Sequence, residues 1–218
     1  MIRDVTILIP ALNEEKTIGK VIGESTERGW TVLVGDNNST DKTCEIATSR
    51  GVVPISVLRR GKGHTIRELI NHIGTPQAVM IDGDYTYLTE DVQCVLGALK
   101  DCDVVIGYRK YRERSSMSFL HIIGNYLLSL LASVLYGYRI NDVNTGLKAF
   151  KTARLKDFGL VSGDFTIEAD IFINAIRHKC KLKQIPISYR ARLNGSKAKL
   201  QILDGLKIGW FLLKERFK

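Results

Sequence analysis

The sequence predicts a single α/β domain with a mostly parallel central sheet. Short apolar runs alternate with helix-like stretches over the first half of the chain, which is the order of β-α-β units. Each apolar run ends in a polar cluster, and ligand-binding loops lie at the carboxyl ends of parallel strands. With 218 residues, 44% of them hydrophobic, the chain is long enough to bury one full core.

The first half of the chain contains five predicted strands with helices between them. The strands are expected at residues 5–12, 30–34, 55–58, 78–81 and 104–107. The helices are expected from the turn Asn13-Glu14-Glu15 to about Glu27, at 42–50, from 59–64 onward and from Thr89 onward. The loop at 35–41 is rich in residues that cap helices, which supports the helix that follows it.

The second half of the chain is less regular. The polar, arginine-rich stretch 110–118 predicts a mobile loop. Residues 119–138 form an apolar run of about the length of a membrane span, which needs ~20 residues. Because His121 and Asn125 would be costly in lipid, a helix in the core or in a groove of the domain is favoured instead.

The basic excess of the chain lies at its C-terminal end. The net charge is +9, yet residues 177–218 hold 12 Lys or Arg against two acidic residues, and the remainder is close to neutral. The helix expected at residues 200–218 combines an apolar stripe of Leu203, Leu206, Trp210, Leu213 and Phe217 with Lys207, Lys214, Arg216 and Lys218. Two interpretations stay open, a helix that lies on an anionic membrane and a helix that packs on the domain.

The remaining composition indicates an intracellular protein that does not bind nucleic acid. No charged and then apolar leader opens the chain, so a cytoplasmic location is expected. The four cysteines lack C-x-x-C spacing, which favours reduced, packing cysteines. Tyr189 and Trp210 are too far apart to form a base-stacking platform, which disfavours RNA.

Asp82-Gly83-Asp84 is the sharpest motif, and it directly follows a predicted buried strand. Two carboxylates at a strand end repel each other, and a divalent cation shared with a diphosphate would relieve that repulsion. Hard cations such as Mg²⁺ and Mn²⁺ bind one or two carboxylates together with phosphate oxygens. The motif therefore predicts Asp82 and Asp84 as metal ligands that stabilise a diphosphate leaving group, with an ordinary turn as the alternative.

Two further polar residues follow predicted strands. Asp36 would accept a hydrogen bond from a base or a ribose, or else cap the following helix. Lys62 lies between two glycines that would let the backbone approach a phosphate, although G-K-G is not a P-loop. The first strand lacks a following G-x-G-x-x-G, which argues against a dinucleotide-dependent oxidoreductase.

Six motifs follow one another along the chain, at residues 9–15 (opening strand and N-E-E turn), 34–41 (D-D-x-S-T-D), Asp82-Gly83-Asp84 (D-x-D), Gly107-Tyr108-Arg109 (G-x-R), 142–150 (D-x-x-T-G-F-R-A-F), and Tyr189-Arg190 with Gly195-Ser196-Lys197 (S-Y-R…G-x-S-K). In this order they resemble the motifs of the family 2 glycosyltransferases of the type A fold, most closely the polyprenyl-phosphate (dolichol-phosphate) sugar synthases. The resemblance spans about residues 6–199. It implies a catalytic domain at 1–199. The residue pattern itself predicts the basic amphipathic helix at 200–218 and, because no uncharged stretch of ~20 residues follows Lys199, no transmembrane domain.

The resemblance also implies a role for each matching residue. Asp84, Arg109 and Asp142 would be catalytic, and Asp82 and Asp84 would bind Mg²⁺ or Mn²⁺. Besides Lys62, which is proposed from its flanking glycines, the residues expected to bind the nucleoside diphosphate sugar are Pro10, Leu12, Glu14, Asp36, Asp82, Gly83, Arg190, Arg192 and Lys197. The last three would form a cationic lid, which suits phosphate because guanidinium forks and ammonium groups bind phosphate oxygens.

Two departures from the family pattern bear on binding. Relatives often carry an arginine just before the Gly-Asn pair of the long helix, where this chain has Ile123. Arg112, Arg114 or His121 would have to replace it. Asn37 stands where a second Asp is common, which removes one potential acceptor of a hydrogen bond from the base or ribose.

The favoured function is inverting transfer of a sugar from GDP-mannose or a UDP-hexose to a polyprenyl phosphate, by an enzyme attached peripherally to an anionic membrane at its cytoplasmic face. A phosphate acceptor is already ionised near pH 7, since its second pKa is ~6, and needs no strong base. Transfer to a glycan or glycolipid hydroxyl is the alternative and needs a base, for which Asp142 is the candidate. A processive polymerase is disfavoured because Q-x-x-R-W is absent.

Two other classes fit less well. A sugar-phosphate nucleotidyltransferase expects a glycine-rich, arginine-bearing loop after the first strand, where this chain has Pro-Ala-Leu-Asn-Glu-Glu. A non-enzymatic binder of nucleotide sugars or RNA would keep its affinity without Asp82 and Asp84 and would show no turnover.

Overall fold

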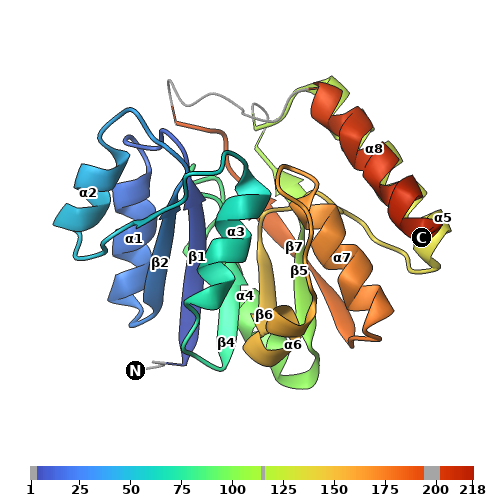
Figure 1. Cartoon of the computed structure of the whole chain (residues 1–218), viewed down its shortest axis with the longest axis horizontal. Coiled ribbons are helices and arrows are strands. Elements are labelled where there is room, and N and C mark those ends of the chain that lie inside the picture. The colour runs from blue at the N-terminus through green and yellow to red at the C-terminus, as the bar shows by residue number, and fades with distance from the viewer. Residues whose placement is uncertain (1–3, 114–115, 194–201) are drawn as a thin grey trace.

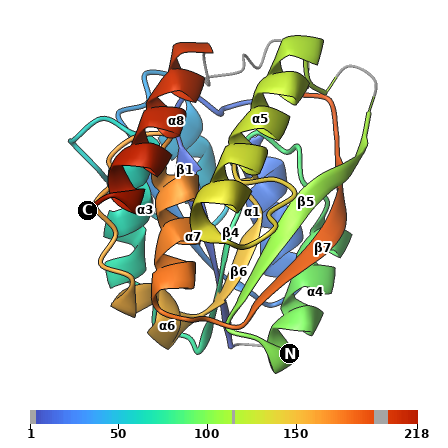
Figure 2. The ribbon, with the colours of Figure 1, turned by 90° about the vertical axis from the view of Figure 1, so that its right-hand side faces the viewer.

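A central sheet with helices on both of its faces organises the chain (Figures 1 and 2). The computed structural model describes residues 4–113, 116–193 and 202–218. The strands are β1 Val5–Ala11, β2 Thr31–Asp36, β3 Ile55–Ser56, β4 Gln77–Met80, β5 Val104–Arg112, β6 Lys148–Lys151 and β7 Leu182–Tyr189. The helices are α1 Ile18–Glu27, α2 Thr43–Ser49, α3 Lys62–Asn71, α4 Thr89–Ala98, the 3₁₀ turn η1 Leu99–Asp101, α5 Phe119–Tyr136, α6 Thr152–Asp157, α7 Ile167–Arg177 and α8 Ile202–Arg216.

The strand order is β3-β2-β1-β4-β6-β5-β7. Every neighbouring pair is parallel except those of β6, which runs antiparallel to both β4 and β5. The prediction of one α/β domain on a mostly parallel sheet is confirmed. The five strands expected in the first half are all present, and their carboxyl ends lie at one edge, the upper edge in Figure 1.

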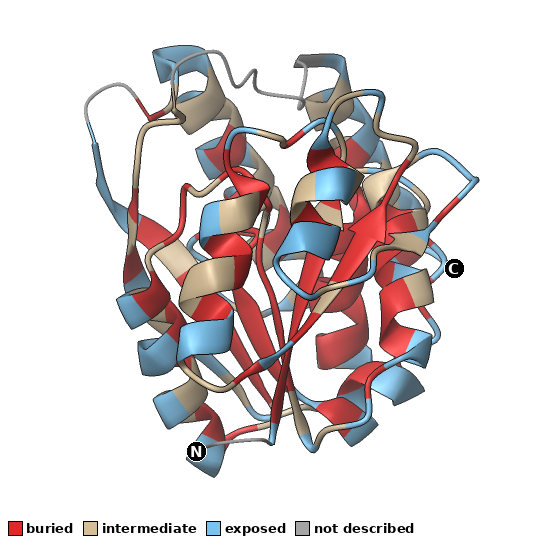
Figure 3. Cartoon of the chain, turned by 90° about the vertical axis from the view of Figure 1, so that its left-hand side faces the viewer, coloured by how far each residue is buried: buried red, intermediate tan, exposed pale blue. Residues whose placement is uncertain are grey.

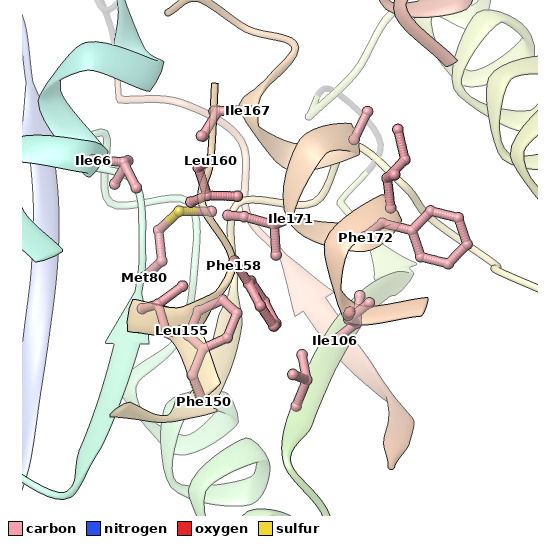
Figure 4. Packing of buried hydrophobic residues seen from close by; sticks show 14 of the residues in the cluster. Ile66, Met80, Ile106, Phe150, Leu155, Phe158, Leu160, Ile167, Ile171 and Phe172 are labelled. Carbon is pink, nitrogen blue, oxygen red and sulfur yellow. The ribbon is translucent and has the colours of Figure 1, made fainter. Parts of the chain in front are cut away.

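Alternation along the strands explains why they are apolar on both sides. In β1, Leu8 faces one buried cluster while Ile7 and Ile9 face another, because successive strand side chains point to opposite faces. The first cluster lies under α3, α6 and α7 and holds side chains such as Met80 and Phe158 (Figure 4). The second lies under α1 and α4. Figure 3 shows the buried strands between helices whose outer sides are exposed.

The region expected to be a mobile loop is partly a strand. Residues 110–112 continue β5, and Tyr111 and Arg112 pair with β7 after a register shift that follows Arg109. The prediction of a loop over 110–118 is therefore wrong for these three residues. Because the chain from 139 to 193 carried no element prediction, α6, α7, β6 and β7 were all missed. The four-residue β6, Lys-Ala-Phe-Lys, is too short to show alternation.

Helix α5 buries small and polar side chains and exposes apolar ones, which is the reverse of an ordinary surface helix. Its buried residues are Asn125, Ser129 and Ala132, whereas Phe119, Tyr126 and Val134 and several leucines are exposed. Among the described residues it is the one helix long and apolar enough, by length and composition, to cross a membrane, and only 17% of it is buried. We expected a core or groove helix, and the structure places instead most of its apolar surface at the outside.

Helix α8 packs alongside α5 in the same direction (Figure 2). The Tyr136 hydroxyl donates to the Leu212 carbonyl at 2.9 Å, and the Arg216 guanidinium donates to the Leu135 carbonyl at 2.7 Å. Ile208 and Leu212 are buried, while Leu206 and Trp210 are about 70% exposed (71% and 68%). The helix thus packs on the domain with one side and leaves an apolar side open.

Candidate active site

A cavity of about 810 Å³ opens at the carboxyl ends of β1, β4 and β5. Parallel strands bring their ends to one edge, so motifs distant in sequence meet there. Of the predicted site residues, Pro10, Leu12, Glu14, Lys62, Asp82, Gly83, Asp84, Arg109 and Arg192 all line this cavity. The sequence-based roles of these residues stay predictions, and their shared location agrees with a single site.

The two carboxylates of the D-x-D motif each contact a cation. The Lys62 ammonium lies 2.5 Å from Asp82 Oδ1 and 2.5 Å from Glu168 Oε1. Arg192 Nε lies 3.0 Å from Asp84 Oδ2. Burial alone would raise the pKa of Asp82, but the Lys62 ammonium beside it holds that pKa below its ordinary value. Asp82 is therefore ionised at neutral pH.

The D-x-D wall fits a hard divalent cation in the chemistry of its donors. Asp82 and Asp84 supply carboxylate oxygens beside open space, and the cations that contact both show that positive charge is accommodated there. No group of three or more His, Cys, Asp or Glu that could hold a metal occurs within the described ranges. Two carboxylates are nevertheless the usual protein share at Mg²⁺ or Mn²⁺ sites that phosphates complete.

Gly146 is the position that makes room for Asp82. A methyl group on Gly146 would overlap the Asp82 carboxylate. The Gly146 backbone N–H donates to the Tyr87 hydroxyl at 2.7 Å, which holds the segment in place. The absence of a side chain at this position lets the D-x-D loop and the segment before β6 approach closely.

Arg109 and Asp142 form a buried, two-pronged ion pair. Arg109 Nε and Nη2 donate to the two Asp142 oxygens at 2.6 and 2.8 Å, and Asn125 Nδ2 donates to Asp142 Oδ1 at 2.9 Å. Asp142 is 1% exposed. Burial raises the pKa of Asp142, but the Arg109 guanidinium lowers that pKa by a larger amount. The pKa of Asp142 therefore lies below its ordinary value. Such a carboxylate is a weak base, and it holds Arg109 at the cavity wall.

The end of the cavity near β1 carries the residues expected to bind the nucleoside. Pro10, Leu12 and Glu14 line it, together with Asn37. Asp36 is buried and does not line the cavity, and its carboxylate accepts from the Ser39 backbone N–H at 3.3 Å. Asp36 thus holds the turn 36–39 and does not cap α2, whose N-cap is Lys42; its binding of a base or ribose stays a prediction.

Asn37 fixes the loop that leads into α3. Its Nδ2 donates to the carbonyls of Val57 and Arg59 at 3.1 and 3.0 Å, and its Oδ1 accepts from the Gly61 N–H at 2.7 Å. The amide at this position is thus used within the protein. Asn37 stands where a second Asp was expected, and its side-chain amide holds residues 57–61 beside the cavity.

The three residues of the expected cationic lid differ in their surroundings. Arg192 lines the cavity and binds Asp84. Arg190 is absent from the cavity wall and lies 5.1 Å from the centroid of the Tyr85 ring. Lys197 lies outside the described residues. Of the three residues expected to form the lid, only Arg192 lies at the cavity within the described residues.

Sequence reasoning missed two ionised groups, Glu168 of α7 and Lys148 of β6. Glu168 lines the cavity and is 3% exposed, and Lys148 is fully buried behind it. The Lys148 ammonium donates to the Thr145 carbonyl, and burial lowers the pKa of Lys148 to about 8. The available signals were a lysine inside the apolar run 147–150 and two acids, Glu168 and Asp170, inside the otherwise apolar run 167–173.

Residues at and just before the first turn of α5 form part of the cavity wall. Ser116, Met117, Ser118 and His121 line it. His121 Nδ1 and the Ser118 hydroxyl are 2.6 Å apart, whereas His121 Nε2 is one of four buried side-chain polar atoms without a partner within the described part of the chain. Asn144 Oδ1, also at the cavity, is another. Of the three candidates for the missing arginine, His121 lines the cavity, Arg112 does not, and Arg114 lies outside the described residues.

Comparison with known proteins identifies relatives over most of the chain. The family described as "Glycosyl transferase family 2" matches residues 6–155. The glycosyltransferase AglJ of Haloferax volcanii is 32% identical over 218 residues, covering 98% of this chain and 71% of the relative. A dolichyl-phosphate hexose transferase of the same organism is 28% identical over 197 residues, covering 89% and 86%.

Solved structures share the fold. Glucosyl-3-phosphoglycerate synthase from Mycobacterium tuberculosis, in complex with Mn²⁺ and UDP-glucose, superposes with a TM-score of 0.77 at 19% identity, covering 98% of this chain and 79% of the other. Its complex with UDP gives the same TM-score at 20% identity. At such identities the likeness establishes the architecture, which is that of type A glycosyltransferases.

Proposed function

The chain belongs to glycosyltransferase family 2, and from this premise we propose that it transfers a hexose, with inversion, from a nucleoside diphosphate sugar to a polyprenyl phosphate. The observation that carries the proposal is the cavity itself. It is lined by the D-x-D carboxylates and by residues at the first turn of α5, where Phe119 and Leu120 are exposed. A site of this kind suits an acceptor with a phosphate head and a hydrocarbon tail.

The donor is GDP-mannose or a UDP-hexose in this proposal. Pro10, Leu12 and Glu14 would contact the nucleoside, and Asp82 and Asp84 would hold Mg²⁺ or Mn²⁺ against the diphosphate. The metal would supply Lewis-acid stabilisation of the leaving diphosphate. A structural neighbour that binds Mn²⁺ and UDP-glucose supports this assignment. Arg109 and Arg192 would add positive charge where the leaving group becomes more negative.

The state of Asp142 favours a phosphate acceptor over a hydroxyl acceptor. A hydroxyl needs a base to remove its proton, and Asp142 has both oxygens bound and a lowered pKa. A phosphomonoester is ionised near pH 7 because its second pKa is ~6. The relative named a dolichyl-phosphate hexose transferase supports the same choice. His121, which lines the cavity, would contact the acceptor phosphate.

The enzyme would work while attached peripherally to the cytoplasmic face of a membrane. Here α5 and α8 form what we term the apolar face, which comprises Phe119, Leu120, Ile123, Tyr126, Leu127, Leu130, Val134, Leu203, Leu206, Trp210 and Phe217. Exposed Lys207, Lys214, Arg216 and Lys218 adjoin it. Apolar area combined with positive charge is suited to anionic phospholipid. A division into a catalytic domain 1–199 and a separate helix stays a prediction.

Product formation tests the proposal directly. The protein is incubated with radiolabelled GDP-mannose, UDP-glucose or another UDP-hexose, with Mn²⁺ or Mg²⁺, and with polyprenyl phosphate. We expect a lipid-linked sugar that disappears in chelator and falls at least ~100-fold in Asp84→Asn, since loss of a transition-state charge contact costs this much. Transfer to a glycan hydroxyl, with none to the lipid phosphate, would refute the acceptor assignment.

A further inference from the structure

The turn that carries the D-x-D motif contains a residue in an uncommon backbone conformation. Tyr85, directly after Asp84, has a φ of 60°, which lies in the left-handed region that is unfavourable for a bulky side chain. Such a conformation persists only where surrounding contacts hold it. Because Tyr85 does not line the cavity, direct contact with a substrate is not the reason for it.

Side chains from three parts of the fold hold Tyr85 in place. Its hydroxyl donates to Glu24 Oε1 of α1, and the Thr89 hydroxyl at the start of α4 donates to Glu24 Oε2. The guanidinium of Arg190, directly after β7, lies 5.1 Å from the centroid of the Tyr85 ring, and the Lys20 ammonium lies 5.5 Å from it. Cations are attracted to the face of an aromatic ring, so both contacts favour the observed position of the ring.

The bend at Tyr85 determines how the Asp84 carboxylate is used. The Thr86 N–H and hydroxyl donate to Asp84 Oδ1 at 3.3 and 2.6 Å. The Thr86 carbonyl in turn accepts from the Arg190 N–H at 2.9 Å. Asp84 Oδ1 is thus bound within the turn, and Oδ2 is the oxygen that pairs with Arg192 at the cavity.

We propose that Glu24 and Arg190 are positioning residues, which hold the turn at Tyr85 and so fix which oxygen of Asp84 is presented to the divalent cation. We term Glu24, Tyr85 and Arg190 the clamp. This inference rests on the proposed function, in which Asp84 is a metal ligand. It gives Arg190 a part different from the phosphate contact that the family resemblance implies.

Equilibrium binding to the full chain tests the clamp without turnover. Calorimetry measures the dissociation constants of UDP and GDP twice, in excess Mn²⁺ and in chelator. For the nucleotide that binds, Glu24→Leu and Arg190→Met should each weaken binding in Mn²⁺ at least about tenfold, the usual effect of removing a residue that orients a metal ligand. Both should leave the affinity in chelator unchanged, which also shows that the variants are folded.

The direction of the two effects separates positioning from long-range electrostatics. Glu24 and Arg190 carry opposite charges, so removal of each charge would by itself shift the affinity for a charged ligand in opposite directions. Loss of positioning instead weakens binding in both variants. Changes of opposite sign in Glu24→Leu and Arg190→Met would therefore overturn the inference.

Matched variants control for the substitutions themselves. Arg190→Lys keeps a cation and should keep most of the affinity in Mn²⁺. Glu27→Leu removes an exposed acid of the same helix α1 and should leave that affinity unchanged. Tyr85→Gly adopts the left-handed conformation without strain, so adding Glu24→Leu to it should have no further effect.

Three other results have a definite meaning. Wild-type affinity in Mn²⁺ for both Glu24→Leu and Arg190→Met overturns the clamp. A loss in Arg190→Met that is as large in chelator as in Mn²⁺ also overturns it, because Arg190 would then contact the phosphates directly. If the wild type binds neither UDP nor GDP, with or without Mn²⁺, the proposed function is overturned together with the clamp.

Discussion

Both carboxylate oxygens of Asp142 accept hydrogen bonds, from Arg109 and from Asn125, and the residue is almost closed to solvent. Asp142→Asn leaves Arg109 buried without its charge partner, and breaking such a pair costs about 3–5 kcal/mol of folding free energy. We expect denaturant unfolding to show a loss of this size. Unchanged stability with a fall in kcat of ~10²–10⁴, the size of a general-base contribution, would show instead that Asp142 is the base of a hydroxyl acceptor.

Lys148 gives the protein a pH dependence of known sign. Burial lowers its pKa from 10.5 to about 8, so between these values the unfolded chain binds a proton that the folded protein does not. Stability then rises with pH across this window, and the cost of the buried ammonium is fully present below pH 8. At 1.36 kcal/mol per pKa unit the rise is on the order of 3 kcal/mol.

Comparison with Lys148→Met isolates that contribution. The unfolding free energy of the wild type minus that of the variant should increase from pH 7 to pH 10.5, because the variant lacks the titrating group. Urea unfolding at several pH values measures it, and the difference cancels the other lysines and tyrosines. A pH-independent difference would mean that Lys148 titrates at its ordinary value in the folded state.

At the scale of elements, the apolar face of α5 and α8 predicts binding to anionic membranes. Leu206→Glu and Leu130→Glu each place a charge in the apolar face and should weaken sedimentation with anionic phosphatidylglycerol vesicles at least ~10-fold, since burial of a leucine contributes about 1.5–3 kcal/mol. Val53→Glu, at an exposed valine between α2 and β3, is the matched control. Binding to neutral vesicles should be weaker, and salt should reduce binding to the anionic ones.

Two results would contradict the membrane assignment. Equal vesicle binding in the two leucine variants and the valine control would show that the apolar face is not in contact with lipid. A wild-type dimer in gel filtration that both leucine variants convert to monomer, with no vesicle binding, would show that the face joins two copies of the chain.

Sequence pattern was enough for the elements of the first half and not for those of the second. Strands β1, β2 and β4 are continuous apolar runs that end in polar turns. Such runs can be recognised as strands without knowing which strands pair with them. By contrast, β6 is recognisable as a strand only between β4 and β5, which hold it on both sides. Its pairing is a tertiary property that four residues do not encode.

Among site residues, motif position predicted a place at the cavity but did not predict charge partners. Asp82, Asp84 and Arg109 line the cavity as expected, because Asp82 and Asp84 follow β4 and Arg109 lies towards the carboxyl end of β5, both of which the sheet fixes. That Lys62 would bridge Asp82 to Glu168 depends on α3 and α7 meeting across the cavity. Contacts between distant helices of this kind need the assembled fold.

At the scale of the whole molecule, the cavity and the apolar face adjoin at the start of α5, where Met117 and His121 line the cavity and Phe119 and Leu120 are exposed. This arrangement would present the site to an acceptor held in a bilayer. The apolar face therefore should matter for acceptor delivery and not for the chemical step.

Acceptor presentation separates these two contributions. Leu206→Glu should turn over a short-chain polyprenyl phosphate dispersed in detergent at the wild-type rate, while its rate on long-chain acceptor in anionic vesicles falls about as far as its vesicle binding. Initial rates under both conditions measure the two effects. A matching loss with the dispersed acceptor would indicate that the substitution disturbs the catalytic site itself.

The amide of Asn37 has a consequence for how this chain can change. Its Nδ2 donates to two carbonyls, of Val57 and Arg59, while its Oδ1 accepts from Gly61. An aspartate here would keep the accepted bond, lose both donated ones, and set a negative charge against two carbonyl oxygens. We therefore expect a substitution at position 37 to be tolerated only together with a compensating change in residues 57–61.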